Sequence, residues 1–388
     1  MPILRGPGTK CAVRIAIVHS FYSTKQPSGE NAAVEAQASA LRRAGHEVRC
    51  FAAHTDQLQG DLLYPIRAAL RVATGRGANP LTALRRFQPD VVHIHNLFPN
   101  FGRRWVEDVS APVVHTIHNF RPLCANGLLY RKGHICTKCL DRSSWHAVQH
   151  RCYRGSVLAT APVAWSLRKG LTADPLLRRS DRLLLLTPLQ RDLYLRAGLP
   201  AHKMVVLPNF VPAELDAGPP PASQRSGSLF VGRLSDEKGV VDLIRSWPEG
   251  EHLSIVGDGP QRKTVAALSA GNKSVTFLGR LPRAQAVAVM RRHRWLVFPS
   301  RWFEALPLVY PEALACGLPV IAFYPSAVAH LVTEEGTGFS VHWHEPWSRA
   351  LSGLSDRTPS PEACRRVFET RYSETAFVQQ YESMLRTL

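Results

Sequence analysis

Short apolar runs rich in β-branched residues alternate with helix-like segments along most of the chain. The first run, Val13–His19, is followed by an amphipathic segment that opens at Ser28 and closes at Gly45, and then by a second run, Glu47–Ala52. Apolar runs of this length are typical of strands buried on both faces, and parallel strands need a long connection, usually a helix. The alternation therefore predicts an α/β fold built on parallel sheets.

A segment poor in apolar residues divides this alternation in two. Residues 212–227 are dense in Pro, Gly and Ser, which is typical of an interdomain linker. We therefore expect an N-terminal domain over residues 1–211, with a cysteine-rich insert at 120–155, and a C-terminal domain over residues 228–361. The last segment, 362–388, has an amphipathic pattern.

Two carboxylates, Glu304 and Glu312, stand eight residues apart in the C-terminal half. Because proline is tolerated only in the first turn of a helix, Pro311 predicts a helix that begins near residues 308–310 and ends at Gly317. Free N–H groups at a helix N-terminus suit a phosphate, and nearby carboxylates suit sugar hydroxyls. The stretch predicts a nucleotide-sugar site, although an isolated Glu pair would be interpreted as solvated surface charge.

Two cations follow the first strand pattern of the C-terminal half. Arg233 comes directly after this strand, and Lys238 stands at the start of the next helix. Paired cations beside free helix N–H groups can neutralise a diphosphate. Without that context, both residues would be interpreted as ordinary surface charges.

In these motifs, and over nearly its whole length, the chain resembles the retaining glycosyltransferase family four, of the bacterial polysaccharide type. The two Glu residues are similar to its Glu-x7-Glu signature, and the two cations to its G-R-L-x3-K-G motif. The resemblance implies the GT-B fold, in which two Rossmann-like domains face a central cleft and residues 362–388 cross back to the first domain. It also implies that Glu304 contacts the donor sugar and Glu312 the nucleotide ribose. Arg233 and Lys238 would bind the donor pyrophosphate, so that these two cations and Glu304 are catalytic candidates.

The chain departs from the family pattern at Pro307, where a glycine is common. Proline has no N–H group, so the resemblance implies that Leu308 or Val309 contacts the β-phosphate instead. Gly29, in the turn after the first strand, would lie beside the donor phosphates. The turns implied to line the nucleobase pocket contain Gly257, Asp258, Gly279 and Arg280.

Two strand patterns of the N-terminal half, 89–96 and 111–119, each end in a His-Asn pair. In open α/β sheets the ligand crevice lies at the carboxyl ends of the strands. The resemblance implies that His118 borders the acceptor and the donor sugar, which makes it the catalytic candidate of this half. His95 and His115 are expected to be structural.

The insert carries four cysteines with the spacing Cys-x11-Cys-x2-Cys-x12-Cys. Four thiolates can hold a tetrahedral zinc ion, which would stabilise a loop that has no core of its own. We therefore expect a structural zinc site, with buried free thiols or a redox disulfide as the alternatives. The predicted ligands are Cys124, Cys136, Cys139 and Cys152, with His134, His146 or His150 as substitutes.

The net charge of +18 is distributed unevenly. Residues 1–226 hold 30 Lys and Arg against 14 Asp and Glu, whereas residues 227–388 hold 18 against 16. This asymmetry favours an anionic membrane surface as a partner of the first half, while general solubility is the alternative explanation. The candidate contacts are Arg67, Arg71 and Arg76, with Ile66, Leu70 and Val72 between them.

The sequence thus favours a hexosyltransferase that uses a UDP- or GDP-sugar. The resemblance implies that it retains configuration by same-face attack, with a covalent intermediate as the alternative, and that it needs no catalytic metal. Its acceptor would be a hydroxyl-bearing glycan or a lipid-linked molecule in polysaccharide or glycolipid assembly. The apolar runs are too short for a membrane span or a signal peptide, so we expect a cytoplasmic protein, peripheral on the inner face of the membrane. The alternatives are a nucleotide-sugar epimerase and a nucleic-acid-binding protein, although no nucleic-acid-binding module is recognisable.

Overall fold

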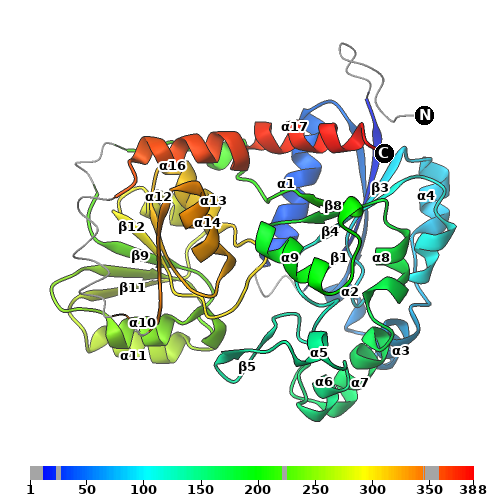
Figure 1. Cartoon of the computed structure of the whole chain (residues 1–388), viewed down its shortest axis with the longest axis horizontal. Coiled ribbons are helices and arrows are strands. Elements are labelled where there is room, and N and C mark those ends of the chain that lie inside the picture. Colours follow the sequence, from blue (N-terminus) through cyan, green and yellow to red (C-terminus); the bar gives the residue numbers. More distant parts are fainter. Residues whose placement is uncertain (1–11, 23–27, 221–224, 344, 346–357) are drawn as a thin grey trace. The chain divides into compact units, whose positions relative to one another are not determined.

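The computed structural model describes residues 12–22, 28–220, 225–343, 345 and 358–388. It separates into two compact units that we describe in turn (Figure 1). Unit 1 comprises the described residues of Met1–Leu129, Cys136–Pro208 and Phe377–Leu388, and unit 2 those of Tyr130–Ile135 and Asn209–Ala376.

Unit 1 is built on six parallel strands in the order β2-β1-β3-β4-β7-β8. All residues of β3 and β4 are buried, because these strands lie in the middle of the sheet. Their apolar side chains form one core with those of the helix α4. The strands are β1 (Arg14–Phe21), β2 (Glu47–His54), β3 (Val91–Asn96), β4 (Val113–Ile117), β7 (Arg182–Leu185) and β8 (Met204–Val206).

The helices of unit 1 differ in how much of their surface is buried. α1 begins after Ser28, whose side chain accepts a hydrogen bond from the Asn31 N–H, and it buries one face. α3 buries none of its residues and packs against α7. The helices are α1 (Gly29–Arg43), α2 (Thr55–Leu58), α3 (Tyr64–Thr74), α4 (Leu81–Phe87), α5 (Lys138–Asp141), α6 (His146–Gln149), α7 (Val157–Leu167), α8 (Pro175–Arg179) and α9 (Pro188–Arg196).

Unit 2 repeats this plan with six parallel strands in the order β11-β10-β9-β12-β13-β14. Its core is formed by apolar side chains of these strands and of α10 and α11. The strands are β9 (Ser228–Val231), β10 (Leu253–Val256), β11 (Val275–Gly279), β12 (Trp295–Phe298), β13 (Val320–Phe323) and β14 (Gly338–Val341). The helices are α10 (Val240–Ser246), α11 (Arg262–Ala270), α12 (Arg283–Met290), α13 (Val309–Ala315), α14 (Ala327–Glu335) and α16 (Pro361–Val367).

The predicted α/β fold with two parallel sheets is confirmed. The last segment is divided more finely than the sequence indicated. α16 and a π-helical turn at Phe368–Tyr372 belong to unit 2, and α17 (Glu374–Leu385) enters unit 1 at Phe377. The short hairpin β5 (Tyr130–Arg131) and β6 (His134–Ile135) groups with unit 2, although the sequence placed it in the N-terminal insert. Within the proposed linker, residues 221–224 lie outside the described residues.

Candidate functional site

The residues expected to bind the donor follow four neighbouring strands of unit 2 at the same edge of the sheet. Arg233 comes after β9, Gly257 follows β10, Gly279 ends β11 and Glu304 comes after β12. Because the carboxyl ends of parallel strands meet at one edge, these residues converge on the place where ligands bind in open α/β sheets.

Two glycines allow the loops at this edge to approach each other closely. A Cβ atom on Gly239, whose φ is +72°, would lie 2.2 Å from the carbonyl oxygen of Pro299. A Cβ atom on Gly257 would lie 2.0 Å from the carbonyl oxygen of Gly232. Side chains at these positions would therefore push the loops apart.

This close packing brings Lys238 against Glu304. The Lys238 ammonium lies 2.6 Å from Glu304 Oε1, and both side chains are largely buried. The same oxygen accepts hydrogen bonds from Ser300 Oγ at 2.5 Å and from the Trp302 indole N–H at 3.0 Å. All three recorded donors thus converge on one carboxylate oxygen, which leaves Oε2 as the atom suited to a ligand hydroxyl.

Glu304 also has a left-handed backbone conformation, with φ of +51°. Residues other than glycine rarely adopt this conformation, and its cost is of the order of 1–3 kcal/mol. Such strain tends to occur at functional sites, where the surrounding structure fixes a side chain in one position. The carboxylate is therefore pre-organised by both its backbone and its hydrogen bonds.

Glu312 lies in the first turn of α13 and is buried. Arg283 Nε, at the start of α12, donates to Glu312 Oε1 at 2.5 Å. Burial raises the pKa of the Glu312 carboxyl, and the Arg283 guanidinium opposes this shift. Arg283 Nη2 is buried without a hydrogen-bond partner, so the pair retains an unused donor. Sequence reasoning missed Arg283, because an arginine at a helix start carries no distinctive signal.

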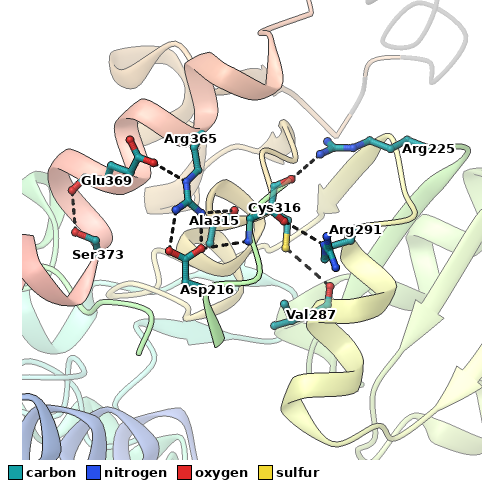
Figure 2. Close-up of polar contacts among 10 residues, drawn as sticks. Asp216, Arg225, Val287, Arg291, Ala315, Cys316, Arg365, Glu369 and Ser373 are labelled. Atoms are coloured by element: carbon teal, nitrogen blue, oxygen red, sulfur yellow. Dashed lines mark hydrogen bonds and ion pairs between the residues drawn. The ribbon is translucent and has the colours of Figure 1, made fainter. Parts of the chain in front are cut away.

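Two arginines hold the C-terminal end of α13 (Figure 2). Arg225 donates to the carbonyl oxygens of Cys316 and Gly317, each at 2.6 Å. Arg365 donates to the Ala315 carbonyl at 2.9 Å and forms a two-armed ion pair with Asp216. Cations at this end of a helix satisfy carbonyls that have no intrahelical partner. They fix α13, and with it the position of Glu312.

The other residues predicted for this edge are more open to solvent. Arg233 and Arg280 are exposed, and no hydrogen bond or ion pair of their guanidinium groups to another described residue is recorded. Asp258 is exposed, accepts a hydrogen bond from the Gly259 N–H and pairs with Arg262. In the first turn of α13 the Tyr310 N–H donates to the Pro307 carbonyl, the Glu312 N–H donates to the Leu308 carbonyl, and Pro311 has no N–H. Among the described residues, no acceptor is recorded for the N–H groups of Leu308 and Val309, which suit an anion.

In unit 1, His118 lies beside His95 at the ends of β4 and β3. Their ring nitrogens Nε2 and Nδ1 are 2.8 Å apart, so one imidazole donates to the other. Burial lowers the pKa of both rings well below the usual value. His118 is therefore neutral near pH 7 and can exchange a hydrogen bond with a ligand without carrying charge. His115 is buried, and its Nδ1–H donates to the Ile94 carbonyl at 2.9 Å.

A carboxylate that sequence reasoning missed lies at the same edge. Glu30 follows Gly29, which is exposed at the first position of α1. The side-chain amides of Asn96 and Asn119 donate to its two oxygens at 2.7 and 3.2 Å. Burial raises the pKa of Glu30 to about 7, while these amides and Arg121 lower it. An acidic residue in the first turn of a helix is common, so no sequence signal indicates this role.

The cysteine insert does not support the predicted zinc site. Among the described residues, no group of three or more His, Cys, Asp or Glu side chains is arranged to hold a metal ion. Burial, with the neighbouring thiols, raises the pKa of Cys139 to about 12, and burial raises that of Cys124. Cys124, Cys136, Cys139 and Cys152 carry no disulfide in the described part of the chain.

Two family models match the chain, one over each half. The model for Glycosyltransferase Family 4 matches residues 27–215, and the model for glycosyl transferases group 1 matches residues 216–366. Together they cover nearly all of both units.

Curated relatives match parts of the chain. An exopolysaccharide phosphotransferase of Streptomyces coelicolor is 29% identical over 243 residues, which are 57% of this chain and 25% of the relative. A D-inositol 3-phosphate glycosyltransferase of Corynebacterium kroppenstedtii is 26% identical over 234 residues, 52% of each chain. The chain thus spans between a quarter and about half of the length of these relatives.

Solved structures match over almost the whole chain. The Anabaena protein HepE in complex with UDP superposes with a TM-score of 0.62 at 15% identity, covering 97% of this chain and all of HepE. Sucrose-phosphate synthase from Thermosynechococcus elongatus gives a TM-score of 0.67 at 18% identity, covering 96% of this chain and 98% of the synthase. At this level of identity, the likeness establishes the shared two-domain fold.

Proposed function

Because its two family-model matches and its fold support a GT-B glycosyltransferase family for this chain, we propose that it is a retaining hexosyltransferase. It would move a hexosyl unit from a UDP- or GDP-sugar to a glycan or a lipid-linked acceptor. The observation that carries the proposal is the convergence of Lys238, Glu304 and Glu312 at the carboxyl edge of the unit 2 sheet. HepE, whose structures contain UDP, glucose or UDP-glucose, supports a nucleotide-sugar donor.

The proposed chemistry follows from the charges at this edge. Lys238 and the exposed Arg233 would neutralise the negative charge that develops on the leaving diphosphate, which is electrostatic catalysis. Glu304 Oε2 would accept a hydrogen bond from a donor sugar hydroxyl, and Glu312 would orient the ribose. We assign retention of configuration to attack by the acceptor hydroxyl on the face of the sugar from which the diphosphate leaves. His118 and Glu30 would lie on the acceptor side.

A binding measurement tests the donor assignment. We expect UDP or GDP to bind the wild type and Arg233→Gln to weaken the affinity by about 10- to 100-fold, because one charge-assisted contact to the diphosphate is lost. Isothermal titration calorimetry with both nucleotides measures this effect. Arg245→Gln is the matched control, since Arg245 is exposed on α10 and pairs with Asp242.

The reaction itself is checked with a panel of UDP- and GDP-sugars, scored for hydrolysis and for epimerised product. Slow donor hydrolysis supports the proposal, because water can replace an absent acceptor. Epimerisation without hydrolysis would favour the epimerase alternative. If Arg233→Gln and Arg245→Gln bind both nucleotides as the wild type does, the assignment of Arg233 is wrong.

The acceptor side carries an exposed apolar surface that supports a membrane partner. Of the ten exposed large apolar side chains among the described residues, nine belong to segments 58–70 and 145–165. Residues 58–76 and 142–169 hold eight Lys and Arg and one acidic residue, Asp61. No described helix meets the length and hydropathy expected of a membrane span.

We propose a peripheral contact with the acidic cytoplasmic leaflet, to which basic residues contribute about 1 kcal/mol each. The nine side chains, which we call the apolar face, are Leu58, Leu62, Leu63, Ile66, Leu70, Trp145, Val157, Leu158 and Trp165.

Liposome co-sedimentation tests this contact. We expect binding to anionic vesicles that falls steeply with added salt and is absent with neutral vesicles. The double variant Ile66→Asp/Leu158→Asp should weaken binding at least about tenfold, because it removes two of the most exposed apolar side chains. Leu278→Asp, at the exposed apolar residue of unit 2, is the control. The membrane contact would be ruled out if the wild type, the double variant and Leu278→Asp all bound anionic and neutral vesicles equally, or if none of them bound either kind of vesicle.

A further inference from the structure

Unit 1 contains a cavity of about 100 Å³ that has no role in the proposed binding of the donor. Its walls come from the carboxyl ends of β3 and β4 and from α3, α7 and α8. His95 and His118 line it, so it adjoins the edge at which the acceptor is proposed to bind. A cavity this small, compared with the roughly 300–1,000 Å³ of a pocket for a drug-sized ligand, fits one group of a larger molecule.

The cavity is lined by two half-buried arginines with unused donors. Arg71 comes from α3, and Arg121 follows β4. Each makes one recorded side-chain hydrogen bond to a carbonyl, from Arg71 to Pro99 at 3.2 Å and from Arg121 to Ala125 at 2.9 Å. The Nε atoms of both are buried and have no hydrogen-bond partner among the described residues. Buried polar groups are normally hydrogen-bonded, so these N–H groups call for an acceptor.

The charges around the cavity favour an anion as that acceptor. A third guanidinium, Arg103, is already neutralised by its ion pair with Asp174. For Arg71, no ion pair with a carboxylate is recorded within the described ranges. Burial lowers the pKa of Arg71, and the nearby Arg67 lowers it further. A buried cation without a counter-ion is costly, and a bound phosphate would relieve that cost.

The apolar walls of the cavity indicate the kind of molecule that would carry the anion. Apolar side chains such as Val72, Phe98 and Leu167 line the cavity beside the two arginines. The Arg121 guanidinium lies 4.2 Å from the centre of the Phe98 ring, which holds it in a fixed position. α3 and α7, which wall the cavity, carry most of the apolar face on their outer sides. This combination suits a phosphate ester that bears an apolar chain.

We propose that this cavity holds the phosphate group of a lipid-linked acceptor, bound by Arg71 and Arg121, with the lipid chain lying along the apolar face. The inference rests on the proposed function for the identity of the acceptor. It goes further by naming the acceptor class and the residues that select it. An unphosphorylated glycan would leave the Arg71 guanidinium without a counter-ion among the described residues.

Calorimetry with a small amphiphile tests this proposal. Geranyl phosphate, kept below its micelle concentration, is titrated into protein saturated with UDP, so that the donor site cannot take up the probe. We expect binding to the wild type and a loss of about 10- to 100-fold in Arg71→Gln and in Arg121→Gln. Arg67→Gln is the matched control, because Arg67 lies on the same helix, is exposed and pairs with Asp61. Thermal melting of each variant verifies that it is folded.

The other probes separate the sources of the phosphate. Geraniol binding as tightly as geranyl phosphate would overturn the anion assignment, and inorganic phosphate binding as tightly would overturn the lipid assignment. An equal loss in Arg67→Gln would overturn the role of the cavity. UDP binding is measured separately with Arg233→Gln and Arg245→Gln in unit 2. A failure of the donor assignment is therefore seen independently of the binding of geranyl phosphate.

Discussion

Lys238→Met is expected to lower kcat for glycosyl transfer by about 100- to 1,000-fold, the loss typical when one pre-organised electrostatic contact to the transition state is removed. It is also expected to destabilise unit 2. Glu304 is buried, and without the ammonium its charge keeps only the hydrogen bonds from Ser300 and Trp302. Breaking a buried ion pair costs about 3–5 kcal/mol, and these two donors reduce that cost. Donor-hydrolysis kinetics and urea denaturation measure the two effects.

The double variant Lys238→Met/Glu304→Gln separates catalysis from stability. Removing the charge of Glu304 together with that of Lys238 should restore much of the lost stability, since no unpaired buried charge remains. Transfer should stay as low as in the single variant. Recovery of activity in the double variant, or a single variant within tenfold of the wild type, would show that Lys238 acts only as the partner of Glu304.

The strands and their alternation with helices could be predicted from the sequence, because a buried parallel strand is a short run of apolar residues. β3 and β4 are mainly apolar, with histidines, Asn96 and Thr116 as their polar residues, and every residue in them is buried. The helix after Glu304 was also predictable, since Pro311 limits where it begins and Gly317, with φ of +60°, marks its end. Local rules of backbone conformation suffice for such features.

The side-chain partners of the candidate site could not be predicted, because they depend on segments far apart in the sequence. Arg283 meets Glu312 across 29 residues, and Arg225 reaches the end of α13 across 92. The cysteine cluster shows the limit of a spacing argument. Its spacing fits a zinc motif, yet no metal-binding group is arranged among the described residues, where Cys124 is buried and the other three cysteines are half-buried. Spacing alone does not determine the direction in which side chains point.

Glu30 differs from Glu304 and Glu312 in unit 2 because no close ion pair with it is recorded among the described residues. Two amides, from Asn96 and Asn119, supply its recorded hydrogen bonds, and the charged or titratable groups that face it are Arg121 and Tyr22. Burial dominates these interactions and raises its pKa from 4.5 to about 7. Keeping Glu30 ionised therefore costs stability. A group that lowers stability at a ligand-binding edge is a functional candidate, here for accepting a proton from the acceptor hydroxyl.

Glu30→Gln is accordingly expected to change stability and activity in opposite directions. Because the pKa is raised in the folded state, the wild type loses stability as the pH rises from about 4.5 to about 7, and the variant does not. The variant should match the wild type near pH 5 and exceed it above pH 7 by up to ~3 kcal/mol, the free energy of the pKa shift. Urea denaturation at pH 5 to 8.5 measures this difference.

Transfer by the Glu30→Gln variant at pH 8 should fall at least about tenfold, since an amide cannot accept the proton, while UDP affinity stays unchanged. A stability difference that does not vary with pH would contradict the raised pKa, and unchanged transfer would contradict the catalytic role.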